Sequence, residues 1–200
     1  KTKYKIAFYA NGGKGSMATQ TLTYNKAAYL TKNAFKRTGY VFAGWAKSAT
    51  GSVVYTNGKA VKNLSASGAT IKLYAKWKPI SYTIAFNANG GSGTMANQAM
   101  TYNKAAYLQK NAFTRSECMF LGWATTAKGA IAYKNAAAVK NLRSTAGTIT
   151  LYARWAKTNY RIAFNANGGL GTMANQVMTY NKAAYLTKNA FKRTGYVFAG

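Results

Sequence analysis

The stretch that decides the fold is Arg37-Thr38-Gly39-Tyr40-Val41-Phe42-Ala43-Gly44-Trp45, where aromatic residues are packed most densely along the chain. Its frame returns as Arg115-Ser116-Glu117-Cys118-Met119-Phe120-Leu121-Gly122-Trp123 and begins a third time at residues 193–200. Trp45 and Trp123 are 78 residues apart, and the same interval separates the tyrosines at 4, 82 and 160. A fixed period of this kind indicates a tandem array of one module, and it has to be recognised before a fold is assigned.

The period divides the 200 residues into repeat 1 (1–78), repeat 2 (79–156) and a partial repeat 3 (157–200). Residues 24–44 and 180–200 are identical over 21 positions, which indicates copy-number expansion of one module. The first residues match those at a junction between repeats, and Gly200 falls one position before the next expected tryptophan. We therefore expect both ends to be internal to a longer array. A 78-residue module buries only a small core, so neighbouring repeats are expected to support each other.

Alternating apolar and polar residues predict the strands of one repeat. Residues 4–10 place Tyr4, Ile6 and Phe8 on one face, and residues 20–24 and 70–77 alternate in the same way. The glycine-rich segment 11–15 suits a hairpin turn between the first two strands. A phosphate-binding loop is a poor alternative for it, because no Lys-Ser/Thr pair follows and the next segment has the pattern of a strand.

Other segments of the repeat have weaker patterns. Residues 40–45 carry bulky side chains on both faces, which predicts a central strand, and Gly44 predicts a bulge that redirects Trp45. Residues 25–36 are expected to form an ordered crossover with up to one helical turn, residues 60–64 a short helix or turn, and residues 78–81 a linker. The predicted fold class is mainly β (α+β), with at most a short helix in each repeat.

The net charge of +27 comes from 28 Lys and Arg residues and a single acidic residue, Glu117. Basic residues make up 14% of the chain, so the unusual feature is the missing acid rather than an excess of base. The basic residues are spread over all three repeats and should attract polyanions in a salt-dependent way. Function in an acidic habitat would explain the missing carboxylates equally well, since little on such a surface titrates below neutral pH.

The inventory of reactive groups is nearly empty, with no His, one Cys and one carboxylate side chain. Acid–base pairs, nucleophile–base pairs and metal-ligand sets all need more than this. We therefore expect no enzymatic activity, no cofactor and no metal. Cys118 stands where repeats 1 and 3 have tyrosine, which suggests a buried or half-buried strand residue, with an intermolecular disulfide as the alternative.

The last strand of repeat 1 has an outward face on which lysine alternates with tyrosine. Such a face can bind an anionic polymer by charge and stacking, although tyrosines also serve simply to cover the exposed side of a sheet. The candidate polyanion contacts are Lys5, Lys72, Tyr74, Lys76 and, in repeat 2, Arg154. The tryptophans, by contrast, are expected to be core anchors: Trp45, Trp77, Trp123 and Trp155. No apolar run approaches the roughly 18 residues that span a membrane, and no motif for sequence-specific nucleic-acid recognition is present.

Three segments together resemble a known family. They are Phe-x-Ala-Asn-Gly-Gly-x-Gly-x-Met-Ala-x-Gln at 86–98, Asn-x-Phe-x-Arg-x-Gly-Tyr-x-Phe-x-Gly-Trp at 33–45, and Leu-Tyr-Ala-x-Trp at 73–77. This frame resembles the Listeria–Bacteroides repeat, also called the internalin B-repeat. The resemblance implies small β-grasp-like domains in tandem on bacterial surface or secreted proteins, without enzymatic activity. The chain departs from the family in lacking acids, notably where Asn57-Gly58 and Asn135-Ala136 replace an expected Asp-Gly turn.

Two functions are compatible with these observations. The first is a structural module of an extracellular or cell-surface protein, forming a stalk or fibre, with an adhesive role open, whose partners are neighbouring repeats and other copies in a fibre. The second is a multivalent cationic module that binds an anionic cell-envelope or matrix polymer: teichoic acid, lipopolysaccharide, sulfated glycan or extracellular DNA. Multivalency would turn weak contacts into avidity.

Overall fold

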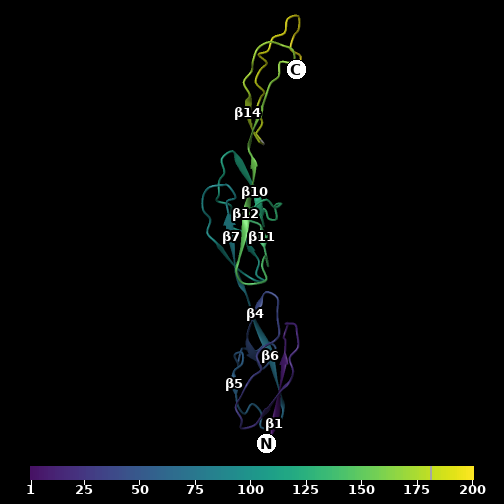
Figure 1. Cartoon of the computed structure of the whole chain (residues 1–200), viewed down its shortest axis with the longest axis vertical. Coiled ribbons are helices and arrows are strands. Elements are labelled where there is room, and N and C mark those ends of the chain that lie inside the picture. Colours follow the sequence, from purple (N-terminus) through teal and green to yellow (C-terminus); the bar gives the residue numbers. More distant parts are fainter. Residues whose placement is uncertain (181) are drawn as a thin grey trace. The chain divides into compact units, whose positions relative to one another are not determined.

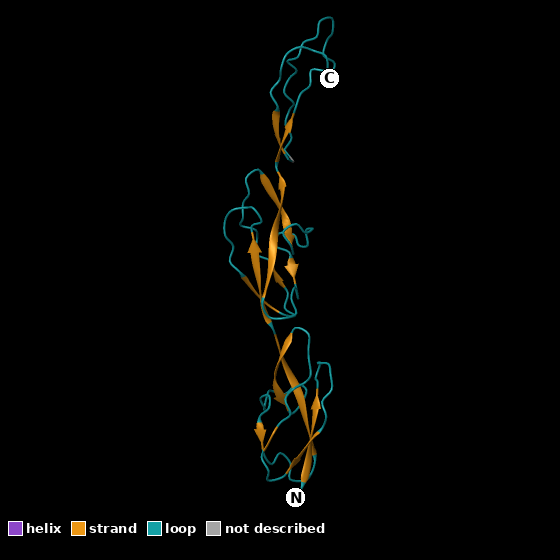
Figure 2. Cartoon of the chain, in the orientation of Figure 1, coloured by secondary structure: helices purple, strands orange, loops and turns teal. Residues whose placement is uncertain are grey.

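The computed structural model describes residues 1–180 and 182–200, and within these residues all regular structure is β-strand, with no helix (Figure 2). No helical turn forms within 25–36, and residues 60–61 are a strand in place of the short helix or turn expected at 60–64. The strands of repeat 1 are β1 (Lys3–Tyr9), β2 (Gln20–Thr23), β3 (Ala28–Tyr29), β4 (Tyr40–Ala46), β5 (Ala60–Val61) and β6 (Thr70–Pro79) (Figure 1). Those that follow are β7 (Ser81–Asn87), β8 (Gln98–Thr101), β9 (Ala106–Tyr107), β10 (Cys118–Ala124), β11 (Ala138–Val139), β12 (Thr148–Lys157), β13 (Asn159–Ile162) and β14 (Gln176–Thr179).

Contacts divide the chain into two compact units. Unit 1 comprises Lys1–Ala85, Asn97–Leu108 and Ala138–Ile149, and unit 2 comprises Phe86–Ala96, Gln109–Ala137 and Thr150–Gly200. This division passes through repeat 2, so the boundaries of the compact units do not coincide with those of the sequence repeats.

The sheet of repeat 1 has the strand order β2-β1-β6-β4. β1 is antiparallel to β2 and parallel to β6, and β6 is antiparallel to β4. The alternation in β1 buries Tyr4, Ile6 and Phe8, which meet Leu73 of β6 and Trp45 of β4 in one core. The sheet of repeat 2 has the corresponding order β10-β12-β7-β8.

The bulge expected in β4 is confirmed, because the register with β6 shifts between Phe42 and Gly44. At Gly44, φ is 143°, and a Cβ there would lie 2.4 Å from Cγ1 of Val53. The shift brings the rings of Phe42 and Trp45 together, with centroids 4.8 Å apart. The expected central position is wrong, however: β4 lies at the edge of the sheet, and Val41 on its other face is 51% exposed.

Two short segments also differ from expectation. Ala60–Val61 forms strand β5, which pairs with β3, because Val61 is buried and its backbone finds a partner in Ala28. The expected linker at 78–81 is almost entirely strand, since Pro79 ends β6, Ser81 begins β7 and only Ile80 lies between them. Ile80 is buried, and both its N–H and its C=O are hydrogen-bonded, so no free linker remains.

Candidate functional site

The outward side of β1 and β6 carries a surface that we call the basic-aromatic face: Lys5, Tyr9, Lys72 and Tyr74. The parallel register places Tyr9 opposite Tyr74, and their rings stack with centroids 4.9 Å apart and planes 18° apart. Both lysines are exposed, and the small Ala7 lies opposite Lys72. The arrangement presents a stacked ring pair beside two cationic side chains.

Lys76 and Arg154, the other two candidate contacts, have structural partners. Lys76 Nζ donates to the carbonyl oxygen of Ala49 at 3.3 Å, and Arg154 Nη1 donates to that of Ala127 at 2.8 Å. Each therefore binds the loop that follows β4 or β10. These contacts leave Lys76 and Arg154 less available to a ligand than Lys5 and Lys72.

Repeat 2 does not reproduce the basic-aromatic face. The positions 78 residues after Lys5, Tyr9 and Lys72 hold Thr83, Asn87 and Thr150, and only the tyrosine of β6 has a counterpart, Tyr152. The face as a whole thus belongs to repeat 1.

A repeated arginine beside the Asn-Gly-Gly turn was not anticipated from the sequence. The guanidinium carbon of Arg37 lies 4.1 Å from the centre of the Tyr40 ring, and that of Arg193 lies 4.3 Å from the Tyr196 ring. Arg115 instead donates to the carbonyl oxygen of Asn89 at 3.5 Å. The signal was present in the arginine of the Asn-x-Phe-x-Arg frame. With one acidic side chain in the sequence, these cations cannot be neutralised by carboxylates.

The four tryptophans fall into two pairs. Trp45 and Trp123 have no exposed surface. Trp77 and Trp155 are half-buried, and their indole N–H groups donate to the carbonyl oxygens of Ala10 and Ala88 at 2.9 and 2.8 Å. Gly13 lies against Trp77 so closely that a Cβ would be 2.6 Å from the ring, and Gly91 lies against Trp155 in the same way at 2.9 Å.

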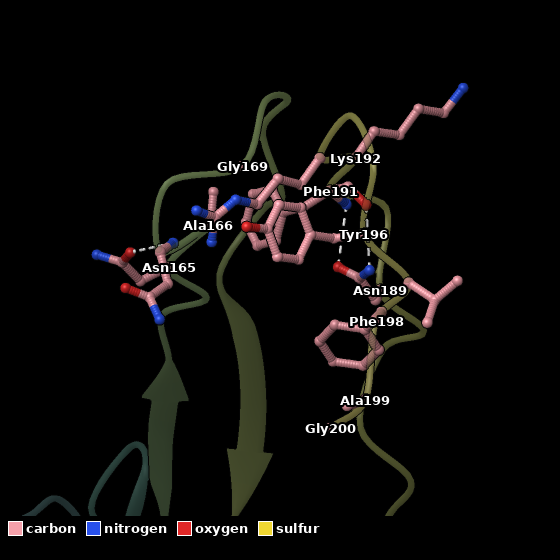
Figure 3. Close-up of a pocket in the computed structure, with 13 residues that line it drawn as sticks. Asn165, Ala166, Gly169, Asn189, Phe191, Lys192, Tyr196, Phe198, Ala199 and Gly200 are labelled. Atoms are coloured by element: carbon pink, nitrogen blue, oxygen red, sulfur yellow. Dashed lines mark hydrogen bonds between the residues drawn. The ribbon is translucent and has the colours of Figure 1, made fainter.

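Repeat 3 contains the largest of the pockets described, an open pocket of about 680 Å³ lined by residues of the segments 165–169 and 189–200 (Figure 3). A second pocket of about 640 Å³ shares several of these residues and is lined also by Phe164, Met173 and Leu186. A third, of about 420 Å³, lies in repeat 1 among Lys1, Thr2 and residues 23–26. Neither Glu117 nor Cys118 lines any of the three pockets. Cys118 is a half-buried free thiol.

Comparison with known proteins identifies the family. The model of the Listeria-Bacteroides repeat domain matches residues 4–76, 82–154 and 160–200. The chain belongs to this family. The resemblance seen in the sequence is thereby confirmed.

A relative in Evansella cellulosilytica, provisionally named a Gly-rich membrane protein, is 28% identical to the chain over 138 residues. The match covers 66% of this chain and 16% of the relative, so the chain spans a small part of that protein. No solved structure is significantly similar to the chain. Within residues 1–180 and 182–200 there is no helix of the length and hydropathy needed to cross a membrane.

Proposed function

We propose that the chain is a structural tandem-repeat module of a bacterial surface or secreted protein, forming part of a stalk or fibre, and that it is not an enzyme. Membership of the Listeria–Bacteroides repeat family supports a surface role, as does a relative named as a membrane protein. We assign the repeat to a β-grasp-like fold, since its first and last strands, β1 and β6, lie parallel at the centre of a four-stranded sheet.

The observation that carries this proposal is the connection between repeats 1 and 2, which lies within unit 1. Ile80 N–H donates to the carbonyl oxygen of Gly39 at 2.9 Å, and Ile80 C=O accepts from Tyr102 N–H at 2.9 Å. The rings of Tyr40 and Tyr102 meet edge to face with centroids 5.7 Å apart. A spacer requires a firm connection between its repeats. A single connecting residue that is hydrogen-bonded on both sides meets this requirement better than a flexible linker would.

The next connection, within unit 2, repeats this backbone pattern. Thr158 N–H donates to the carbonyl oxygen of Glu117 at 2.6 Å, and Tyr180 N–H donates to that of Thr158. Its side chains differ, because Cys118 stands in place of Tyr40 and supplies no ring for Tyr180. The backbone bonds therefore do not depend on the aromatic pair.

The spacer role is tested by displaying arrays of different repeat number between a cell-surface anchor and a fluorescent tag. We expect the height of the tag above the surface to rise by an equal step for each added repeat. Gly/Ser linkers of equal residue number serve as controls, since the span of a flexible chain grows only with the square root of its length. A tag height that follows the Gly/Ser series, or that does not change with repeat number, contradicts the spacer role.

The second candidate function, multivalent binding of an anionic polymer, is favoured by the basic-aromatic face and by the arginines beside the three turns. Cationic side chains with adjacent rings suit phosphate, sulfate or carboxylate groups on a polymer. Binding that weakens steeply with salt distinguishes this function from that of a spacer.

A further inference from the structure

We propose that the two-stranded ribbons of repeats 1 and 2, formed by β3 with β5 and by β9 with β11, are binding sites for an acidic polysaccharide. The proposal rests on the second candidate function, polyanion binding, and assigns to it a repeated site and a class of ligand. One sugar ring packs on an exposed tyrosine of the ribbon, Tyr29 or Tyr107. The anionic group of that sugar pairs with a neighbouring lysine, Lys62 or Lys140.

The ribbon of repeat 1 holds Tyr29 in a fixed place on the surface. Tyr29 is 74% exposed, whereas the next residue, Leu30, is 2% exposed. Leu30 N–H donates to the carbonyl oxygen of Lys59 at 2.9 Å, and Gln20 Nε2 donates to that of Tyr29 at 2.8 Å. The backbone that carries the ring is therefore already ordered, so little backbone entropy is lost when a ligand binds.

The Tyr29 ring does not serve to cover the ribbon. Tyr29 lies opposite Ala60 in the antiparallel register, and Ala60 is itself exposed. A tyrosine that shielded the strands would bury its cross-strand neighbour and become half-buried itself. The ring is instead left in water beside a small side chain. Exposed tyrosines of this kind are typical of surfaces that bind a partner.

A lysine follows the ribbon on the side of the ring. Lys62 comes directly after the buried Val61, so alternation along the extended chain directs Lys62 to the same side as Ala60 and Tyr29. Lys62 is exposed, and repeat 1 has no carboxylate side chain to pair with it. An unpaired cation beside an exposed ring is complementary in charge to an anionic sugar.

The ribbon of repeat 2 has the same arrangement. Tyr107 is also 74% exposed and lies opposite Ala138, which is exposed as well. Gln98 Nε2 donates to the carbonyl oxygen of Tyr107 at 2.8 Å. Lys140 is exposed and follows the buried Val139. The two ribbons therefore present equivalent sites.

This repetition matters because avidity requires the same contact in successive repeats. The basic-aromatic face cannot supply it, since repeat 2 has other residues at three of the four positions of that face. The tyrosine and lysine of the ribbon are exposed, yet they are unchanged between the two repeats. Exposed aromatic and charged residues that stay the same while others change indicate binding rather than packing.

The form of the site favours a polysaccharide over a nucleic acid. Neither Tyr29 nor Tyr107 lines any of the three pockets, so none of these pockets encloses the ring. Proteins that bind single-stranded nucleic acids combine a basic groove with several rings that stack on successive bases. One ring for each ribbon suits one sugar, because the negative face of an aromatic ring attracts the C–H groups of the sugar.

The test measures binding of the complete 200-residue chain to heparin, a sulfated and carboxylated polysaccharide, by surface plasmon resonance between about 50 and 200 mM salt. Tyr29→Ala with Tyr107→Ala should weaken binding at least about fivefold at each salt concentration, as expected when aromatic anchors are truncated. The slope of log affinity against log salt should not change, because no charge is removed. Lys62→Ala with Lys140→Ala should instead lower that slope by up to about two.

Matched variants and ligands serve as controls. Tyr29→Phe with Tyr107→Phe keeps both rings and should bind heparin as the unchanged chain does. Val41→Ala with Leu121→Ala removes exposed apolar side chains outside the ribbons and should also leave the affinity unchanged.

The choice of polymer identifies the groups that are recognised. Inorganic polyphosphate has charge but no sugar ring, so the tyrosine-to-alanine variants should bind it as tightly as the unchanged chain does. Hyaluronan carries carboxylates and no sulfate. The same loss of affinity with hyaluronan assigns carboxylate as the anionic group, whereas binding to heparin alone assigns sulfate.

The outcomes separate this proposal from polyanion binding in general. Absence of heparin binding even at about 50 mM salt contradicts polyanion binding itself. If heparin binds and the tyrosine-to-alanine variants bind it as tightly as the unchanged chain, the ribbon site is wrong while polyanion binding stands. The proposal is also overturned if the double tyrosine variant loses no more affinity than either single variant. A larger loss for oligo(dT) than for heparin overturns it too, because the ligand is then a single-stranded nucleic acid.

Discussion

At the scale of single residues, the two tryptophans of each repeat contribute to stability by different physical means. Trp123 is fully buried among Phe86, Phe113 and Phe120, and its indole N–H makes no hydrogen bond among the described residues. Trp155 is half-buried and its N–H is bonded to Ala88. Trp123 thus acts through buried packing alone, and Trp155 through packing together with one hydrogen bond.

Substitution of these tryptophans should separate the two contributions. We expect Trp123→Ala to cost about 3–5 kcal/mol, as for other buried aromatic residues. Trp123→Phe should cost much less than Trp123→Ala because phenylalanine fills most of the buried volume, whereas Trp155→Phe also removes a hydrogen bond worth about 1 kcal/mol. Urea unfolding of the complete chain measures these differences. A cost below about 1 kcal/mol for Trp123→Ala would contradict the assignment of Trp123 to the core.

The sequence indicates which residues are apolar enough to be buried and which are charged, but not which loop atoms their side chains contact. Alternation in residues 70–77 places Lys76 on the outward face, yet its ammonium group reaches the carbonyl of Ala49 in the loop after β4. Irregular loops have no period that reveals such a contact. For the same reason, the arginine beside the Asn-Gly-Gly turn became visible only in the folded chain.

At the scale of strands, alternation locates the long strands β1 and β6 but not the two-residue strands β3 and β5. A strand of two residues contains no full period, so its pairing is decided by tertiary contacts. Residues 78–81 were expected to form a linker, but Pro79 is the last residue of β6, where no further ladder hydrogen bond is required of its nitrogen. The connection between repeats is therefore much tighter than the sequence indicated.

Gly39 tests this connection. Its φ is 76°, and a Cβ would lie 2.2 Å from the Tyr102 ring. We expect Gly39→Ala to displace Tyr102 and to destabilise the junction by roughly 1–3 kcal/mol, because strain at positive φ adds to the clash. Faster hydrogen exchange at the Ile80 and Tyr102 amides would measure the loss.

Gly195→Ala is the matched control for this substitution. Gly195 has the same neighbours in sequence and a φ of 77°, but no atom lies within 4 Å of its Cβ position. Gly195→Ala should therefore show the effect of backbone strain alone. The position itself tolerates a side chain, since Glu117 occupies it in repeat 2 with a φ of 57°. If the two substitutions have equal local effects, the close approach of Tyr102 contributes nothing.

At the scale of the whole molecule, the sequence fixes the total charge but not its arrangement. We expect affinity for heparin to rise with the number of repeats and to fall steeply between about 50 and 200 mM salt, with a slope that grows with the number of basic contacts. Surface plasmon resonance over a salt series measures both. If the affinity for heparin does not change with salt concentration, or does not rise with repeat number, polyanion binding is contradicted.

Paired variants show whether the basic-aromatic face is the contact surface. Lys5→Thr with Lys72→Thr introduces the residues that repeat 2 has at these positions, Thr83 and Thr150. Lys128→Thr with Lys134→Thr makes the same change in charge outside the face. A larger loss of affinity in the first pair locates binding at the face, whereas equal losses indicate attraction by the diffuse positive field.

The parallel pairing of β1 with β6 determines how a repeat bears tension. The chain enters the fold through one of these neighbouring strands and leaves through the other, and β6 runs almost directly into β7. A pull on the two ends draws β1 and β6 past each other in opposite directions. The residue pairs from Lys5–Thr70 to Tyr9–Tyr74 are then loaded in shear, all at once rather than one after another. Because forced unfolding is governed by the unfolding rate, this geometry lets a small, marginally stable domain withstand pulling for longer than its equilibrium stability implies.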